Sequence, residues 1–201
     1  YICPFWFDEY QEMIDFYALK KDRSFVSYMQ TWGLPEVIRI EDTTMQKNYV
    51  KAVINTILVK DIFFRLGKKQ TKDSWLFLQL LAYLSNIIGS IVSLKNIVET
   101  LQKEQGVTIS LPTFSHYMQE ILASYLIHKV PRYNILGKCL FQQKDKYYFN
   151  DLWIRNSFWY DSVYDKGKIL ENIVFLHLKR LWYEIYVGEN ETKEIDFVIK
   201  K

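Results

Sequence analysis

Hydrophobic residues near the N-terminus recur at the spacing of a helix. The clearest series, at intervals of three and four, is Phe25, Tyr28, Met29 and Trp32. Such a series places apolar side chains on one helical face. Because Asp8 and Ser24 can each cap an N-terminus, we expect helical structure over 8–32, stopped by Gly33 and Pro35.

A longer amphipathic stripe follows over 45–66. Its members are Tyr49, Val50, Val53, Ile54, Ile57, Leu58, Ile62 and Phe63. Gly67, with two lysines directly after it, suits the C-terminus of this helix, because cations are favourable at the negative end of the helix dipole. Residues 1–70 are therefore predicted to form a helical subdomain.

The next part of the chain, 71–158, has shorter elements. Three helices are expected over 73–84, 93–104 and about 110–123, followed by strands over 125–133 and 139–149. Ser93 and Ser110 are suited to cap the second and third helices, and Pro112 suits a first turn. Three short helices and a hairpin are the order of a winged helix-turn-helix, in which the third helix would read DNA.

The last part, 159–201, is predicted to be mixed. A helix over 168–182 precedes strands over 184–187 and 194–199, and two strands alone are too few for a stable sheet. The expected fold class is thus mainly α with a small β component (α+β).

One uncharged stretch, 74–94, is 21 residues long, enough to span a bilayer. Its Ser-Asn and Gly-Ser pairs favour a break between two helices, so no membrane partner is expected. Cys3 and Cys139 are too few for a disulfide framework or a thiolate zinc site, which favours a cytoplasmic protein. Hydrophobic residues are 49% and charged residues 24% of the chain, a balance that excludes a disordered class.

Charge is distributed unevenly. Residues 51–155 carry 14 basic and 7 acidic residues, a net of +7, while 1–50 carry −3 and 156–201 carry −1. A basic middle part can face phosphate. The candidate base-reading residues are Thr113, Ser115, His116 and Gln119, and the candidate phosphate contacts are Lys95, Lys103, Lys129, Arg132 and Lys138. Since the third helix has no cation, the sequence supports a protein-docking or spacer role as strongly as DNA binding.

Little in the sequence indicates catalysis. The chain has no phosphate-binding G-x-x-x-x-G-K-[ST] loop, and its three histidines lie far apart, so no metal site is expected. Glu171 and Asp196 resemble the carboxylates with which a nuclease holds Mg²⁺, but that chemistry also needs a third acid and a lysine. The alternative is local pairing, in which Glu171 caps its helix or pairs locally and Asp196 pairs with Lys193.

Six segments, taken in order, resemble a family of prokaryotic AAA-type ATPases with a DUF4143-like C-terminal region, related to the archaeal ATPase family. They are 4–10 (PFWFDEY), 24–38 with its G-L-P-E block, 57–65 (ILVKDIFFR), 147–156 (YYFNDLWIRN), 167–172 (GKILEN) and 194–198 (EIDFV). The sequence departs from the family at Trp32, where a glycine pair is expected, and at Trp153-Ile154, where Gly-Leu precedes the arginine.

This resemblance implies that an ATPase domain with Walker motifs precedes the chain, binding ATP and magnesium, and that 159–201 begin a restriction-endonuclease-like domain. Glu171 and Asp196 would then occupy acid positions. Arg65 and Arg155 would face nucleotide or a neighbouring subunit, or else form buried ion pairs with Asp61 and Asp151.

The expected function is that of an accessory or regulatory, nucleic-acid-associated part of such an ATPase, without catalysis by this segment itself. The expected partners are the ATPase domain, DNA and further copies of the chain. The alternatives are a protein-interaction scaffold and a Mg-dependent nuclease domain, active or remnant.

Overall fold

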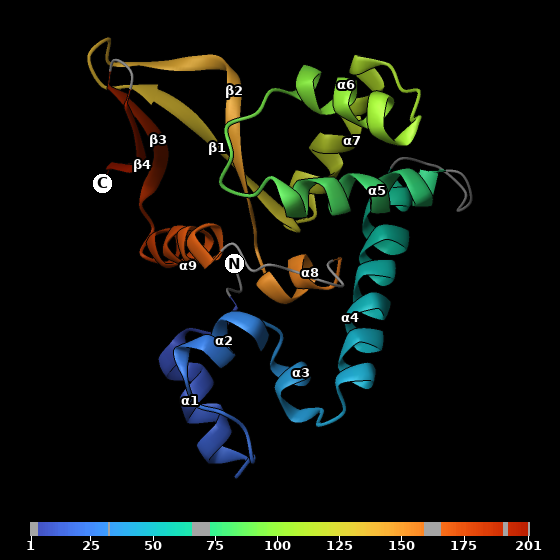
Figure 1. Cartoon of the computed structure of the whole chain (residues 1–201), viewed down its shortest axis with the longest axis vertical. Coiled ribbons are helices and arrows are strands. Elements are labelled where there is room, and N and C mark those ends of the chain that lie inside the picture. Colours follow the sequence, from blue (N-terminus) through green and yellow to red (C-terminus); the bar gives the residue numbers. More distant parts are fainter. Residues whose placement is uncertain (1–3, 32, 66–72, 159–165, 191–192, 201) are drawn as a thin grey trace.

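The structure is a computed structural model, and it describes residues 4–31, 33–65, 73–158, 166–190 and 193–200. The N-terminal part is helical (Figure 1). Its elements are α1 (Phe7–Phe16), α2 (Phe25–Thr31), α3 (Pro35–Arg39), α4 (Thr43–Ile57) and the π-helical η1 (Leu58–Phe63).

The predicted helix over 8–32 is two helices. The chain leaves α1 through Ala18, which has a left-handed backbone with φ 49°. Ser24, whose hydroxyl donates to Asp22, then accepts from the Ser27 amide at 3.1 Å and begins α2. Ser24 therefore caps a helix as expected, whereas Asp8 lies inside α1. At the start of α1 the Glu9 carboxylate accepts from the Trp6 amide at 2.8 Å.

The helix predicted over 45–66 is confirmed as far as residue 65, where the described residues stop. Asp42 caps α4 by accepting from the Met45 amide at 2.7 Å, and Val50 and Ile54 are buried. The helix changes to π-helical geometry at Leu58, which the sequence did not indicate. The proposed stop at Gly67 lies outside the described residues.

The remaining elements follow the predicted order, with α8 added. They are α5 (Asp73–Asn86), α6 (Leu94–Gln105), α7 (Leu111–Ala123), β1 (Ile127–Asn134), β2 (Cys139–Phe149), α8 (Leu152–Asn156), α9 (Lys166–Arg180), β3 (Glu184–Asn190) and β4 (Lys193–Lys200). Ser93 and Ser110 cap α6 and α7 as expected, accepting from the amides of Asn96 and Thr113. Both predicted caps are confirmed.

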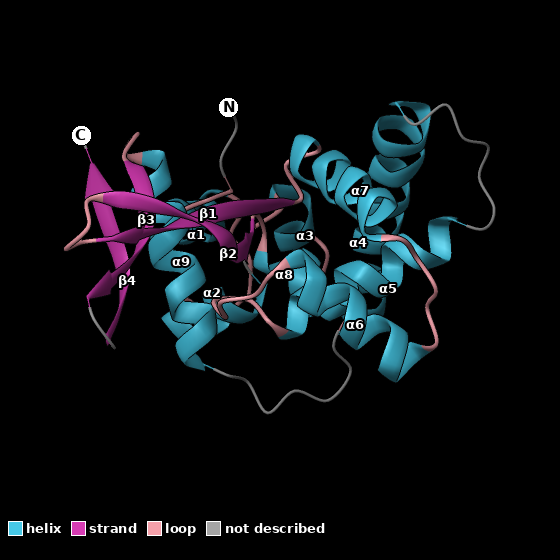
Figure 2. Ribbon diagram, turned by 90° about the horizontal axis from the view of Figure 1, so that it is seen from above, coloured by secondary structure: helices cyan, strands magenta, loops and turns pink. Residues whose placement is uncertain are grey.

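The four strands form one mixed sheet in the order β2-β1-β3-β4. β1 pairs antiparallel with β2, and parallel with β3 through three residue pairs, Arg132–Asn134 with Val187–Glu189. The last two strands, too few for a stable sheet by themselves, are joined to the preceding hairpin through β3. Before α6, Val92 makes an isolated antiparallel bridge to Asp145 of β2. Figure 2 shows the sheet at one end of the molecule and α4 to α7 at the other.

Two hydrophobic cores hold these elements together. The first joins α4, η1, α5, α6, α7 and α8, with Leu58, Phe77 and Phe114 fully buried. The second joins α1 and α2 to the sheet and α9, with Tyr148 and Phe175 stacked at 4.6 Å between ring centroids. Each core contains residues from more than one of the three predicted domains. The division into domains at 70 and 158 remains a prediction. Among the described helices, none combines the length and hydropathy needed to cross a bilayer.

A glycine closes the turn between α2 and α3. Gly33 has φ 129°, and a Cβ built there would lie 1.9 Å from an oxygen of the Asp151 carboxylate. Asp151 is itself buried and caps α8, accepting from the amides of Trp153 at 2.7 Å and Ile154 at 3.4 Å. The turn and the start of α8 can pack this closely only because residue 33 has no side chain.

We expect Gly33→Ala to destabilise the protein far more than Gly106→Ala. Both glycines have positive φ, but a Cβ at Gly106 meets nothing within 4 Å, so that variant carries only backbone strain of about 1 kcal/mol. Chemical denaturation would measure both free energies of unfolding. Equal losses for the two variants would show that contact with Asp151 is unimportant.

Burial also makes Asp151 sensitive to pH. It raises the pKa of this carboxyl from 3.8 to about 7, against the opposing effect of the two backbone hydrogen bonds. The folded protein therefore keeps a proton that the unfolded chain has lost between about pH 4 and 7, and stability falls as the pH rises through this window.

Asp151→Asn retains an oxygen acceptor and cannot ionise. The variant's advantage over the wild type in unfolding free energy should grow from pH 4 to pH 7, by a few kcal/mol at about 1.4 kcal/mol per pKa unit, and then level off. Urea unfolding of both proteins at several pH values measures this difference. A difference that stays constant from pH 4 to 8 contradicts the assignment.

Candidate functional site

The outer face of α7 carries the candidate base-reading residues. Phe114, Tyr117 and Ile121 bury the inner face of the helix in the first core. Thr113, His116 and Gln119 are consequently exposed, whereas Ser115 is half-buried. The structure thus places three of the four predicted residues on one solvent-facing surface. The Thr113 hydroxyl lies 2.8 Å from that of Ser110.

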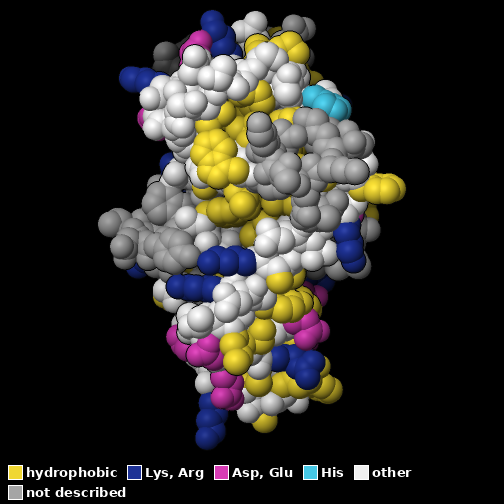
Figure 3. Space-filling view, turned by 90° about the vertical axis from the view of Figure 1, so that its right-hand side faces the viewer, with side chains coloured by type: hydrophobic (Ala, Val, Ile, Leu, Met, Phe, Trp, Pro, Cys, Tyr) yellow, Lys and Arg dark blue, Asp and Glu magenta, His cyan; other side chains and the backbone are white. Residues whose placement is uncertain are grey.

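The predicted phosphate contacts divide into two groups. Lys95 and Lys103 of α6 and Lys138 of the hairpin turn are exposed, with Lys95 only 3.7 Å from Glu99. Lys129 and Arg132 of β1 are engaged by carboxylates instead: Lys129 lies 3.1 Å from Asp145, and Arg132 forms an ion pair with Glu189. Acidic side chains gather at the other end of the molecule, in the lower part of Figure 3.

The two arginines assigned to nucleotide or a neighbouring subunit bind within this chain. Arg65 donates to the Glu120 carboxylate at 2.6 Å and to its backbone oxygen at 3.1 Å, which joins the end of η1 to α7. Its predicted alternative partner, Asp61, is exposed. Arg155 is buried and donates to the Ser85 backbone oxygen at 3.2 Å and to Asn156. Both arginines therefore join elements of the fold.

A second constellation surrounds a buried lysine. The ammonium group of Lys146, on β2, lies 2.6 Å from Glu171 of α9 and 3.4 Å from Asp196 of β4, and it pairs with Glu194 of β4 as well. The Lys146 side chain is 1% exposed, while those of Glu194 and Asp196 are 43% and 66% exposed. The structure thus brings the two predicted acids together, around a lysine of the β1–β2 hairpin.

A tyrosine completes this group. The Tyr148 hydroxyl donates to the same oxygen of Glu171 at 2.5 Å, and burial together with this carboxylate raises the tyrosine pKa. Burial alone would lower the pKa of Lys146, but the hydrogen bonds to Glu171 and Glu194 outweigh it and raise the pKa. Lys146 is therefore held in its charged form and Tyr148 in its neutral form.

An irregularity in β4 directs Asp196 at the lysine. Tyr186 pairs with Val198 and Gly188 with Ile195, so the single residue Val187 faces both Asp196 and Phe197. Such a bulge rotates the strand and allows successive side chains to reach the same side. Phe197 accordingly packs against Tyr148, at 5.9 Å between ring centroids, while Asp196 reaches Lys146.

The sequence did not single out Lys146, Tyr148 or Glu194. Each pair, 146 with 148 and 194 with 196, shows the alternation that puts two side chains on one face of a strand. That signal was present, but the partnership joins β2 to β4, which are at opposite edges of the sheet. The local pairing of Asp196 with Lys193 is not the arrangement that the structure shows.

The carboxylates around Lys146 do not form a preformed metal site. Within the described residues, no group of three His, Cys, Asp or Glu side chains is arranged to hold a metal ion. The position that a cation would take between Glu171 and Asp196 is filled by the Lys146 ammonium group. His128, the buried histidine, is instead hydrogen-bonded to Asn150, and burial lowers its pKa to about 4.

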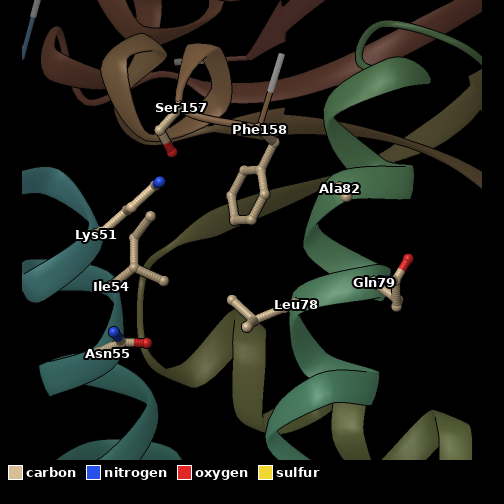
Figure 4. A pocket seen from close by; sticks show the side chains of 8 residues that line it. All are labelled: Lys51, Ile54, Asn55, Leu78, Gln79, Ala82, Ser157 and Phe158. Carbon is tan, nitrogen blue, oxygen red and sulfur yellow. The ribbon is translucent and has the colours of Figure 1, made fainter. Parts of the chain in front are cut away.

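A pocket of about 320 Å³ lies between α4 and α5 (Figure 4). Its lining residues are Lys51, Ile54, Asn55, Leu78, Gln79, Ala82, Ser157 and Phe158. The Phe158 ring projects between the two helices. Such a volume is at the small end of the range for ligand sites, and among the described residues the lining contains no carboxylate that could hold magnesium.

Lys146→Met should cost about 3 kcal/mol of unfolding free energy at pH 7, because removing one member of a buried ion group leaves like charges together. Lys95→Met removes an exposed lysine from an i,i+4 pair and should change stability by less than about 0.5 kcal/mol. If Lys146→Met lowered the unfolding free energy as little as Lys95→Met does, Lys146 would not stabilise the fold through its buried ion pairs.

Two relatives that match the chain are both described as uncharacterized proteins. A protein of Haemophilus influenzae is 28% identical over 202 residues, covering 100% of this chain and 49% of that protein. A protein of Methanocaldococcus jannaschii is 26% identical over 176 residues, covering 86% of this chain and 38% of that protein. The chain thus spans about half, or less, of the length of these relatives. No solved structure matches it significantly.

These comparisons correct the expected relationship. The assignment to AAA-type ATPases with a DUF4143-like region is wrong, because the family that matches is another one and both relatives are uncharacterized. The ATPase domain and the ATP–magnesium cofactor were implied by that resemblance alone, so they lose their basis. The match covers residues 22–159, more than half of the chain, and the chain therefore belongs to the family described as a domain of unknown function, DUF8612.

Proposed function

We propose that this chain is a non-catalytic DNA-associating module that binds duplex DNA through the exposed face of α7. The single observation that carries the proposal is the presentation of Thr113, His116 and Gln119 to solvent by a helix whose other face is buried. Hydroxyl and amide groups on such a helix can hydrogen-bond to base edges in the major groove.

The surrounding elements support a winged-helix interpretation of 73–149. α5, α6 and α7 precede the β1–β2 hairpin, and an isolated antiparallel bridge joins Val92, between α5 and α6, to Asp145 of β2. In a winged helix-turn-helix, the third helix of this order enters the groove. The exposed lysines of α6, Lys95 and Lys103, are available as phosphate contacts beside it.

The other functional predictions have less support. A nuclease needs its metal between Glu171 and Asp196, where Lys146 lies. A scaffold role is favoured by one observation, the parallel pairing that fixes the β1–β2 hairpin to β3 and so limits its freedom to contact DNA. Association that is independent of DNA, and unaffected by changes on α7, would favour that role.

We expect wild-type protein to bind a labelled duplex with micromolar or weaker affinity, and with affinity that falls as salt increases, because phosphate contacts release counterions. Thr113→Ala combined with Gln119→Ala should weaken binding by about 10-fold or more, since each lost base contact costs about 1–3 kcal/mol. Fluorescence anisotropy between 20 and 200 mM salt would measure both effects.

The matched control is Thr44→Ala with Asn48→Ala, which removes the same kinds of groups from exposed positions of α4. It should leave affinity unchanged. No binding at 20 mM salt, or equal affinities for the α7 variant and this control, would overturn the proposal.

A further inference from the structure

Three cations of the β1–β2 hairpin, Lys129, Arg132 and Lys146, pair with carboxylates, whereas Lys138 and Lys144 are exposed. Lys129 is paired within the hairpin, with Asp145. Arg132 and Lys146 are paired outside it, Arg132 with Glu189 of β3 and Lys146 with Glu171, Glu194 and Asp196. We call Glu189, Glu194 and Asp196, the partners supplied by the β3–β4 hairpin, the carboxylate clamp.

The backbone connection between the two hairpins is short. Only three residue pairs join β1 to β3, at the end of the hairpin farthest from α7. The ion pair of Arg132 with Glu189 lies at this junction, and Lys146 reaches the clamp from the outer strand β2. Side-chain charge therefore adds substantially to a small backbone contact in holding the hairpins together.

Burial keeps these two cations from solvent. The side chain of Arg132 is 15% exposed and that of Lys146 is 1% exposed. The Arg132 guanidinium also lies 4.6 Å above the Phe141 ring. While the clamp is in place, neither cation can reach a DNA phosphate. Within a winged helix, however, the hairpin is the element that lies along the DNA backbone beside the recognition helix.

Carboxylates and phosphates are recognised by the same donors. Arginine binds either through paired N–H groups, and lysine binds either as a point charge. The clamp thus supplies to the hairpin what a DNA backbone would supply, negatively charged oxygens on a neighbouring surface. A polyanion can compete for these cations, and the competition depends on the charge of the clamp.

We propose that the carboxylate clamp is an autoinhibitory contact that imitates a phosphate backbone and withholds Arg132 from duplex DNA, while Lys146, which Glu171 of α9 also holds at 2.6 Å, stays with the sheet. This proposal rests on the proposed function, and it assigns a regulation to the same winged-helix unit. With the clamp closed, α7 and the exposed lysines bind DNA weakly. With the clamp open, the hairpin adds Arg132 as a phosphate contact.

The test compares two variants of equal net charge. The clamp variant is Glu189→Gln with Glu194→Gln and Asp196→Asn. The control is Asp8→Asn with Glu12→Gln and Glu41→Gln, which neutralises three exposed acids away from the sheet. At 100 mM salt the clamp variant should bind a labelled duplex about 10-fold or more tightly than the control. Its plot of log affinity against log salt should be steeper by about one, because the added phosphate contact of Arg132 contributes about 0.9.

Adding Thr113→Ala and Gln119→Ala to each protein separates this inference from the proposed function. Binding that depends on α7, with no difference between clamp variant and control, overturns the clamp alone. If the clamp variant binds more tightly than the control and the α7 substitutions do not change its affinity, the α7 proposal is overturned and the clamp is supported. Absence of binding by every protein overturns both.

A measurement on the wild type avoids any folding defect in the variants. Amide hydrogen exchange at Val187–Glu189 should accelerate when duplex DNA is added, because these residues pair with β1 at the junction. Unchanged or slower exchange there, at DNA concentrations that saturate binding, contradicts opening of the clamp.

Discussion

The arrangement of the sheet depends on one buried ammonium group. Lys146 enters from β2, one edge of the sheet, and meets carboxylates from α9 and from β4, the other edge. A buried lysine is tolerated only with such partners, because an isolated charge in the interior costs several kcal/mol. Once Lys146 occupies this position, α9 and the β3–β4 hairpin must lie against the β1–β2 hairpin.

The N-terminal helices complete the arrangement by packing against α9 and α8. Arg180 at the end of α9 makes a bidentate ion pair with Glu9 of α1, at 2.6 and 2.8 Å, and stacks over Trp6 at 4.5 Å. On the other side, Gly33 allows the α2–α3 turn to touch Asp151 at the start of α8. The contacts of Gly33 with Asp151 and of Glu9 with Arg180 each join segments more than 100 positions apart in the sequence. Each hydrophobic core is accordingly built from distant parts of the chain. In this setting α7 is held rigidly by its apolar face and by Arg65, and its outer face remains open.

Local patterns predicted the local structure well. Periodicity and serine caps located α5, α6, α7 and α9, because these features depend on neighbours a few positions away. The left-handed Ala18 was not predicted, since alanine carries no signal for a break. The parallel pairing of β1 with β3 depends on tertiary contacts, so local patterns could not predict it. The buried position of Lys146 depends on the same contacts, and the sequence showed this residue only as one cation of a basic segment. Glu171 and Asp196 were identified as a pair by residue type, but the lysine between them could be found only from the sheet order and the bulge. The six short segments, even in this order, are not specific to the ATPase family, because the family that matches the chain is another one.

The most direct test of this account is a double-mutant cycle between Lys146 and Glu171. Lys146→Met, Glu171→Gln and the double variant would be unfolded in urea, and the same cycle would be made with Lys95→Met and Glu99→Gln. We expect a coupling free energy of about 1–3 kcal/mol for the buried pair and about 0.3–0.5 kcal/mol for the exposed i,i+4 pair. A coupling at Lys146 no larger than that of the exposed pair would contradict the claim that this ammonium group organises the sheet.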